Sequence, residues 1–188
     1  MNYKNLLEAL LFSSPEPLNQ KKFNDILDID EIIDMKSLVD ELNDEYEKLN
    51  KGLMVKNISG GYQILTDPMY HHYIEKIFDR KKKMTLSRPA LEALSIVAYK
   101  QPLTRSEIES IRGVDCGGVI KTLMERNFIK VNGRSKSPGR PLLFGVTKRF
   151  LESFGLNKIT DLPKLKELSE LLNDDEKLEL FPHDNAVE

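Results

Sequence analysis

The apolar and polar residues in the second half of the chain alternate in a pattern that predicts three helices followed by two strands. Leu91, Leu94, Val97 and Ala98 recur at helical spacing with little polar interruption, so their helix should be central and buried. The expected segments are helices at 88–100, 104–112 and about 115–127, then strands at 128–133 and 142–147 joined by a basic loop at 134–141. This is the element order of a winged-helix domain.

A capping box marks the start of the second of these helices. In the pattern T-x-x-E, the side chains of Thr104 and Glu107 each accept a hydrogen bond from the exposed backbone amide of the other residue. The helix that follows should end near Gly113. The third helix then occupies the recognition position of a helix-turn-helix.

The first half of the chain repeats this order in a shorter form. Its expected segments are helices at 3–12, 20–28 and 37–51, a hairpin with a Ser-Gly-Gly turn at 59–61, and a helix at 69–78. We expect Asn19 to cap the second helix and Gly52 to end the third.

Two short words recur between the halves. LEAL stands at 7–10 and again at 91–94, and Pro17-Leu18-Asn19 recurs as Pro102-Leu103-Thr104. Together with the matched order of elements, they predict two related modules. The predicted fold class is therefore mainly α with small β-hairpins (α+β), arranged as two tandem winged-helix domains.

We divide the chain into four parts. They are an N-terminal winged helix at 1–80, a linker at 81–86, a C-terminal winged helix at 87–160, and at 161–188 a short helix with an acidic, disordered tail. The basic run that begins at Arg80 is open to two interpretations, a solvated connector or an arm that contacts phosphates. In the last part, Leu165, Leu168, Leu171 and Leu172 share one helix face, which is suited to docking on the body or on a partner.

Charge is distributed unevenly although the net charge is only -2. Residues 1–80 carry 9 basic and 15 acidic side chains, residues 81–150 carry 15 and 5, and residues 151–188 carry 4 and 10. The basic middle of the chain is suited to nucleic acid, to an acidic partner or to its own acidic flanks.

No pattern in the sequence predicts an enzyme, and we expect no cofactor, metal or small-molecule substrate. The phosphate-binding glycine motifs are missing, and Cys116, the only cysteine, has neither zinc-ligand partners nor a base. One cysteine fits a reducing compartment, and no apolar run approaches the ~20 residues of a membrane span. We therefore expect a cytoplasmic protein with no membrane partner.

The two modules could bind DNA or protein. Arg134 and Lys136 in the basic loop are candidate DNA contacts, because a wing lies where phosphates are met. The third helix of the first module, however, carries five acidic residues between positions 40 and 47, a surface that repels phosphate. A scaffold built for protein contacts is therefore preferred, with a winged-helix DNA-binding transcriptional regulator as the alternative.

A family resemblance is carried by LSRPALEALSIVAYKQPLTRSEIESIRGV, GVIKTLMERNFIKVNGR, GRPLLFGVT and FLESFGLNKITDLP, in that order. Over about residues 5–163 the chain resembles the bacterial segregation and condensation protein B (ScpB) family. The resemblance implies a non-catalytic subunit of the SMC condensin complex, which serves chromosome condensation and segregation in cell division. It also implies a homodimer formed through the N-terminal winged helix, and binding to the kleisin ScpA, which bridges the heads of the SMC ATPase. Contact with DNA would then be weak or indirect, and the protein would reach the nucleoid through the complex.

Three residues are candidates for partner contact. Tyr99 and Leu103 are expected either to line a groove for the kleisin or to pack in the core. Arg140, in G-R-P-L-L-F, is expected either to meet the partner or to pair with a helix carboxylate such as that of Glu107.

Overall fold

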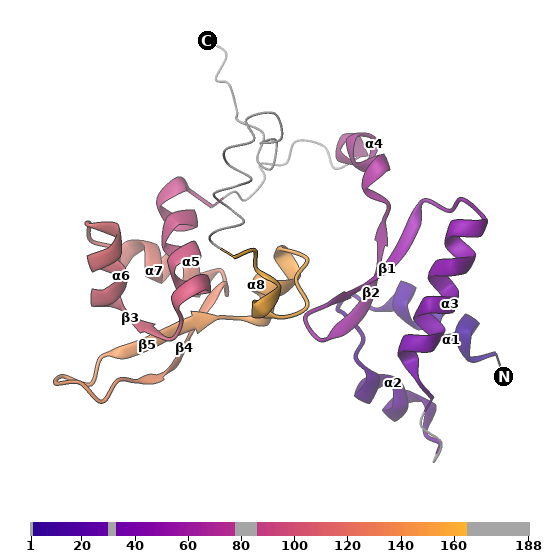
Figure 1. Cartoon of the computed structure of the whole chain (residues 1–188), viewed down its shortest axis with the longest axis horizontal. Coiled ribbons are helices and arrows are strands. Elements are labelled where there is room, and N and C mark those ends of the chain that lie inside the picture. The colour runs from indigo at the N-terminus through magenta and orange to yellow at the C-terminus, as the bar shows by residue number, and fades with distance from the viewer. Residues whose placement is uncertain (1, 30–32, 78–85, 165–188) are drawn as a thin grey trace, which may run out of the picture.

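The computed structural model describes residues 2–29, 33–77 and 86–164, and these residues form two winged-helix modules (Figure 1). The predicted fold class, mainly helical with small β-hairpins, is confirmed. Most of the predicted linker and the predicted acidic tail lie outside the described residues, at 81–85 and from 165 onward.

The first module has three helices, a hairpin and a fourth helix. Its elements are α1 (Tyr3–Ser13), α2 (Gln20–Leu27), α3 (Met35–Lys48), β1 (Leu53–Ile58), β2 (Gly61–Thr66), the 3-10 helix η1 (Pro68–Tyr70) and α4 (His71–Ile77). The strands pair antiparallel around Ser59 and Gly60, whose φ angles of 53° and 79° suit a two-residue hairpin turn. Asn19 caps α2 as predicted, accepting a hydrogen bond from the amide of Lys22 at 2.8 Å.

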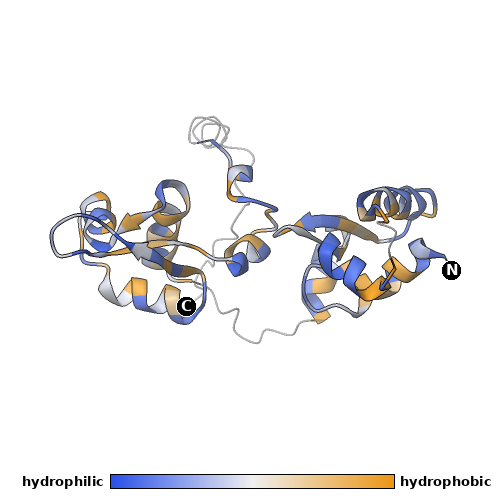
Figure 2. Ribbon diagram, turned by 90° about the horizontal axis from the view of Figure 1, so that it is seen from below, coloured by the Kyte–Doolittle hydropathy of each residue, from blue (hydrophilic) through white to orange (hydrophobic). Residues whose placement is uncertain are grey.

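The core of this module forms where the helices turn their apolar sides toward the hairpin. Leu7, Phe23 and Met35 have no exposed surface. The side-chain amide of Asn43 pairs with both backbone groups of Val55, at 2.8 and 3.0 Å, and so fixes α3 against β1. Hydrophobic and hydrophilic residues alternate along the helices of both modules, as amphipathic helices require (Figure 2).

The second module has the same plan with one more short strand. Its elements are α5 (Arg88–Lys100), β3 (Leu103–Thr104), α6 (Arg105–Arg112), α7 (Gly117–Glu125), β4 (Ile129–Arg134), β5 (Leu142–Val146), α8 (Lys148–Ser153) and the 3-10 helix η2 (Ile159–Asp161). The sheet order is β3-β5-β4, antiparallel throughout. α5 is the predicted central helix, and its Ala93 and Val97 have no exposed surface. Leu86 and Leu162 also pack against this core, just outside the bounds expected for the module.

The internal repeat predicted from sequence has a clear structural counterpart. Leu18 forms a backbone bridge to Tyr62 on β2, and Leu103 pairs with Phe144 on β5. Both leucines are buried, and the residue after each one caps the following helix. The two modules therefore attach the turn between their first and second helices to the second strand of the hairpin in the same way.

One predicted helix end is wrong. α3 ends before Asn50, which takes the left-handed conformation with φ of 49°, while the amide of Lys51 returns to the carbonyl of Tyr46 at 2.8 Å. Gly52 serves packing instead. A Cβ at this position would lie 2.8 Å from the ring of Tyr70, so only glycine permits this approach without movement of the ring.

The two modules touch at the hairpin turn of the first. The amide of Ser59 donates to the carbonyl of Leu156 at 2.9 Å, and the amide of Gly60 donates to the side-chain oxygen of Asn157 at 2.8 Å. The segment after α8 thus accepts the two amides that the turn presents.

Candidate partner-binding surfaces

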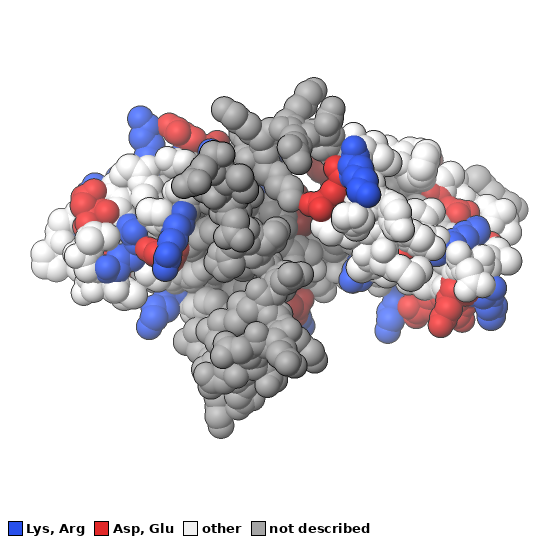
Figure 3. Space-filling view, turned by 90° about the horizontal axis from the view of Figure 1, so that it is seen from above, with Lys and Arg blue, Asp and Glu red and all other residues white. Residues whose placement is uncertain are grey.

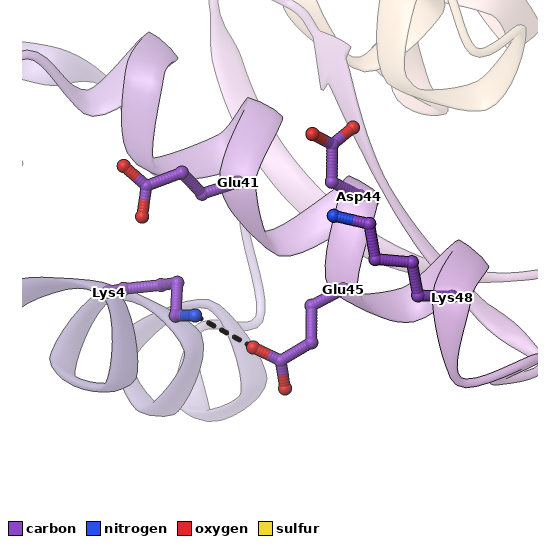
Figure 4. Close-up of a pocket in the computed structure, with 5 residues that line it drawn as sticks. All are labelled: Lys4, Glu41, Asp44, Glu45 and Lys48. Atoms are coloured by element: carbon purple, nitrogen blue, oxygen red, sulfur yellow. Dashed lines mark hydrogen bonds and ion pairs between the residues drawn. The ribbon is translucent and has the colours of Figure 1, made fainter.

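The outer face of α3 is acidic and is partly neutralised by its neighbours. Lys4 on α1 donates to the Glu45 carboxylate at 2.7 Å, a contact drawn in Figure 4. This hydrogen bond is the main reason that the pKa of Glu45 is lowered and the pKa of Lys4 is raised. Glu41 and Asp44 line the same shallow hollow, of about 330 Å³. The helix in the recognition position of the first module is therefore unsuited to phosphate.

The helix in the recognition position of the second module is α7, and cations near it are already paired. Arg105 contacts both Glu109, at 2.6 Å, and Asp115. The hydrogen bond from Arg105 is the main cause of the lowered pKa of Glu109. Lys121 lies 3.9 Å from Glu125. On the face seen in Figure 3, cationic and anionic side chains lie among one another on both modules, without a continuous field of one sign.

The basic wing brings together three of the residues singled out from the sequence. Arg134 ends β4, Lys136 and Arg140 lie in the following loop, and all three are exposed. The guanidinium of Arg134 donates to the carbonyl of Arg140 at 3.2 Å, and the amide of Arg140 donates to the carbonyl of Ser137 at 2.9 Å. The loop is thus closed on itself, with the charged ends of Lys136 and Arg140 facing solvent.

The structural role considered for Arg140 is not realised. Glu107 uses its carboxylate in the capping box, accepting from the amide of Thr104 at 2.6 Å and from its hydroxyl at 2.8 Å. The backbone hydrogen bond is the main cause of the lowered pKa of Glu107. Among the described residues there is no ion pair between Glu107 and Arg140.

Tyr99 lies in an apolar groove of about 290 Å³ between α5 and α8. The residues that line the groove are Leu91, Leu94, Ser95, Ala98, Tyr99, Phe150, Phe154, Leu162 and Pro163. Tyr99 is half-buried, and its hydroxyl donates to the carbonyl of Pro163 at 2.9 Å. Phe154 remains 43 % exposed although its ring packs on that of Phe150, at 4.8 Å between centroids. The groove therefore presents apolar surface that nothing in the described chain covers.

Leu103 lies elsewhere. It is 4 % exposed and belongs to the core of the second module. Its remaining surface borders a separate hollow of about 460 Å³, beside Glu107 and Ile111. The structure thus separates Tyr99 from Leu103, which the sequence had suggested as neighbours in one groove.

A second uncovered apolar surface lies on η1 and α4. Met69, Tyr73 and Ile77 are 71 %, 67 % and 76 % exposed, and their spacing of four residues places them along one side of this helical segment. α4 has no buried residue and stands away from α1, α2 and α3 in Figure 1. We call these three residues the α4 stripe.

Sequence reasoning missed the α4 stripe, and of the residues that line the groove it singled out Tyr99 alone. The spacing of the α4 stripe was visible in MYHHYIEKIF, but only the fold shows that no other helix covers it. The groove combines α5 with Phe150 and Phe154, which lie about fifty residues further along the chain, so no local pattern could have revealed it.

No group of three or more His, Cys, Asp or Glu residues in the described part of the chain could hold a metal ion. Cys116 is buried, and this burial raises the pKa of its thiol. No helix within residues 2–29, 33–77 and 86–164 is long and apolar enough to cross a membrane.

Comparison with known proteins shows which family the chain belongs to. The model of the family described as "Segregation and condensation complex subunit ScpB" matches residues 5–165. Segregation and condensation protein B of Desulforamulus reducens is 46 % identical, over 87 % of this chain and 90 % of the relative. That of Syntrophotalea carbinolica is 40 % identical, over 96 % and 90 %. The crystal structure of a conserved hypothetical protein from Chlorobium tepidum is 38 % identical, over 82 % of this chain and 98 % of that one, with a TM-score of 0.38. The chain therefore belongs to the ScpB family, the accessory subunits of the bacterial SMC-type segregation and condensation complex.

Proposed function

We propose that this chain acts as a homodimer that binds the kleisin ScpA and, through it, joins the SMC ATPase in chromosome condensation and segregation. The proposal gives the N-terminal module to dimerisation and the C-terminal module to the kleisin. The observation that carries it is that the described part of each module leaves an apolar surface uncovered, the α4 stripe on the first and the α5–α8 groove on the second.

For the α4 stripe we propose a second copy of the same stripe as the partner. An interface with two-fold symmetry would bury Met69, Tyr73 and Ile77 from both chains. Burial of one large apolar side chain contributes about 1.5–3 kcal/mol, so six would together contribute roughly 9–18 kcal/mol. Association itself costs roughly 4–15 kcal/mol. Because these terms are similar in size, one charge placed in the stripe should be enough to separate the copies.

For the groove we propose a helical or extended segment of the kleisin as the occupant. Tyr99 and Phe154 give the groove two aromatic walls, and the Tyr99 hydroxyl supplies a polar group at one end. Leu103 lies in the core beside a separate hollow and is not part of this groove. Arg140 on the wing is a candidate for contact with acidic residues of the kleisin.

Contact with DNA is a lesser part of the proposal. Arg134 and Lys136 are exposed and suited to weak phosphate contact when the protein is held near the nucleoid by the complex. The transcriptional-regulator alternative requires base readout from α7, whose neighbouring cations are paired with carboxylates.

The dimer is tested by light scattering on the purified full chain. We expect twice the chain mass of 21.6 kDa for the wild type and the mass of one chain for Tyr73→Glu. Asn57→Glu is the matched control, because Asn57 is an exposed, uncharged residue on β1 that does not belong to the stripe. A wild-type monomer, or a Tyr73→Glu dimer, would refute the interface.

Kleisin binding is tested by calorimetric titration with a kleisin fragment. Phe154→Glu should lower the affinity at least about tenfold, because it places a charge in an apolar groove. Ser153→Glu, an exposed neighbour outside the groove, should bind as the wild type does. Equal affinities for Phe154→Glu and the wild type would show that the kleisin does not bind in the groove.

A further inference from the structure

The outer edge of β4 has no partner strand. In the order β3-β5-β4 this strand comes last, so one side of its backbone is unpaired within the described part of the chain. The amide of Thr147, after β5, donates to the carbonyl of Phe128 at 3.1 Å, so this carbonyl points toward β5. Because successive residues of a strand turn their backbone groups to opposite sides, Lys130 also faces β5, whereas Ile129 and Val131 face away. We call the outward backbone of these last two residues the β4 edge.

The internal repeat gives the β4 edge a counterpart in the first module. Tyr62 and Phe144 are equivalent, because each pairs with the buried leucine that joins the helices to the hairpin. Their partners in the outer strands are therefore equivalent as well, and so are the residues two positions before these partners. By this register Ile129 on β4 is the counterpart of Val55 on β1, and both residues are buried.

The helices α3 and α7 match in the same way. Each helix, taken with its N-cap, places three buried residues at spacings of four and then three, which are Met35, Val39 and Leu42 in the first module and Cys116, Ile120 and Leu123 in the second. The next residue is Asn43 in α3 and Met124 in α7. Asn43 takes up both outward backbone groups of Val55, at 2.8 and 3.0 Å. A thioether has no N–H to donate, so Met124 cannot do the same for Ile129. The second module therefore leaves open an edge that the first module closes.

The side chains around the β4 edge define the chemistry of its partner. Met124 and Val131 are 37 % and 39 % exposed, so apolar surface lies beside the edge. Lys130 is exposed on the opposite face of the strand, because neighbouring side chains alternate. Arg134 adds a second exposed cation at the end of β4. An incoming strand with apolar side chains on one face and carboxylates on the other would match both features.

We propose that the β4 edge binds an acidic, extended segment of a partner protein, which joins the sheet as an outer strand beside β4. Hydrogen bonds to the backbone of Ile129 and Val131 supply the affinity, and Lys130 supplies the preference for acidic segments. A second copy of β4 does not fit, since pairing two such strands would bring the cations of both chains together. Neither Ile129 nor Val131 lines the α5–α8 groove, so this docking does not rest on the proposed function.

The probe for the β4 edge is a blocked hexapeptide of alternating glutamate and valine, titrated into the full chain. Fluorescence anisotropy of the labelled peptide gives the affinity, and amide hydrogen exchange reports on Val131. We expect saturable binding with several-fold slower exchange of the Val131 amide, because this amide becomes a hydrogen-bond donor. The same peptide with lysine in place of glutamate should bind at least about tenfold more weakly.

Two substitutions close the edge in different ways. Met124→Asn copies the cap of the first module and should lower the peptide affinity about tenfold, because its amide would occupy the backbone groups of Ile129. Met124→Leu is the matched control and should bind as the wild type does. Val131→Pro removes an outward N–H, which an edge strand tolerates, and should also weaken binding.

Charge is tested separately by Lys130→Glu, which should lower the affinity for the glutamate peptide about tenfold. Lys100→Glu makes the same change of charge at an exposed position at the end of α5 and should leave the affinity unchanged.

Four results would contradict the proposal. It is overturned if the wild type does not bind the glutamate peptide, or if Met124→Asn and Val131→Pro both bind it as the wild type does. Equal binding of the glutamate and lysine peptides would overturn the preference for acidic segments. Loss of peptide binding in Phe154→Glu would show that the peptide lies in the α5–α8 groove instead. Slow exchange of the Val131 amide in the free protein that is lost on dilution would assign the edge to a second copy of the chain.

Discussion

The side chain of Asn157 accepts a hydrogen bond from the backbone amide of Gly60 at 2.8 Å, so a residue of the second module holds the hairpin turn of the first. A second bond, from Ser59 to the carbonyl of Leu156, lies beside it. Since Ser59 and Gly60 lie in the turn between the paired strands, their amides have no partner in the ladder and need another acceptor. The Asn157–Gly60 bond is the part of this contact that a side-chain substitution can remove.

Asn157→Ala should loosen the arrangement of the two modules without unfolding either of them. One hydrogen bond of this kind contributes about 0.5–1.5 kcal/mol. Its loss is enough to change several-fold the population of molecules in which the two modules are in contact. The measurement is the distance distribution between spin labels on Asp25→Cys and Lys121→Cys in a Cys116→Ser background. We expect a broader distribution for Asn157→Ala, whereas Asn157→Asp keeps an acceptor oxygen and serves as the control. Equal widths for the alanine variant and the wild type would contradict the prediction.

The capping box of α6 should make the stability of the second module depend on pH in the acidic range. The pKa of Glu107 is lowered chiefly by the amide hydrogen bond from Thr104. A carboxyl group whose pKa is lower in the folded state stabilises the fold above its ordinary value of about 4.3 and loses this effect as the pH falls through its folded pKa. Glu107→Gln keeps a side-chain acceptor but cannot titrate, so its stability should fall less between pH 5 and pH 3.

Urea unfolding at several pH values measures this difference. Thr104→Ser keeps both bonds of the box and should follow the wild-type pH dependence, whereas Thr104→Ala should cost about 1 kcal/mol at neutral pH. Parallel acid profiles for Glu107→Gln and the wild type would show that Glu107 contributes no pH dependence.

Much of the fold was predictable because its signals are local. The capping box and the Asn19 cap each depend on residues three apart, and both appear as expected. The end of α3 was not predictable in this way. Gly52 looked like the terminating residue, but its role is to let the ring of Tyr70 come close, and Asn50 ends the helix instead.

The candidate site was only partly predictable, for the same reason. The wing residues Arg134, Lys136 and Arg140 lie in one loop, so their grouping follows from the sequence. The walls of the groove come from α5 and α8, and the burial of Leu103 depends on its pairing with Phe144 on β5. These contacts join residues about forty or more positions apart, which periodicity cannot detect.

Gly61→Ala should destabilise the first module. A Cβ at this position would lie 2.9 Å from the backbone carbon and oxygen of Leu18, and a backbone group cannot move aside as the end of a flexible side chain can. The bridge between Leu18 and Tyr62 would have to open, at a cost of about 1–3 kcal/mol. Urea unfolding followed by circular dichroism measures the change. Gly118→Ala is the control, because its Cβ meets nothing within 4 Å and alanine favours a helix, so stability should hold or rise.

Charge reversal on the wing should separate DNA contact from kleisin contact. Lys136 and Arg140 share one exposed loop, but only Arg140 is proposed to meet the kleisin. Lys136→Glu should weaken DNA binding by the full chain and lower the slope of log affinity against log salt by about 0.9, the amount expected for one lost phosphate contact. Kleisin affinity should stay unchanged in Lys136→Glu and fall in Arg140→Glu. The measurements are fluorescence anisotropy with duplex DNA at several salt concentrations and calorimetry with the kleisin fragment, with Lys158→Glu as an exposed control away from the wing. If Lys136→Glu leaves the salt slope unchanged, the wing makes no phosphate contact through this residue, and its basic character serves the protein partner alone.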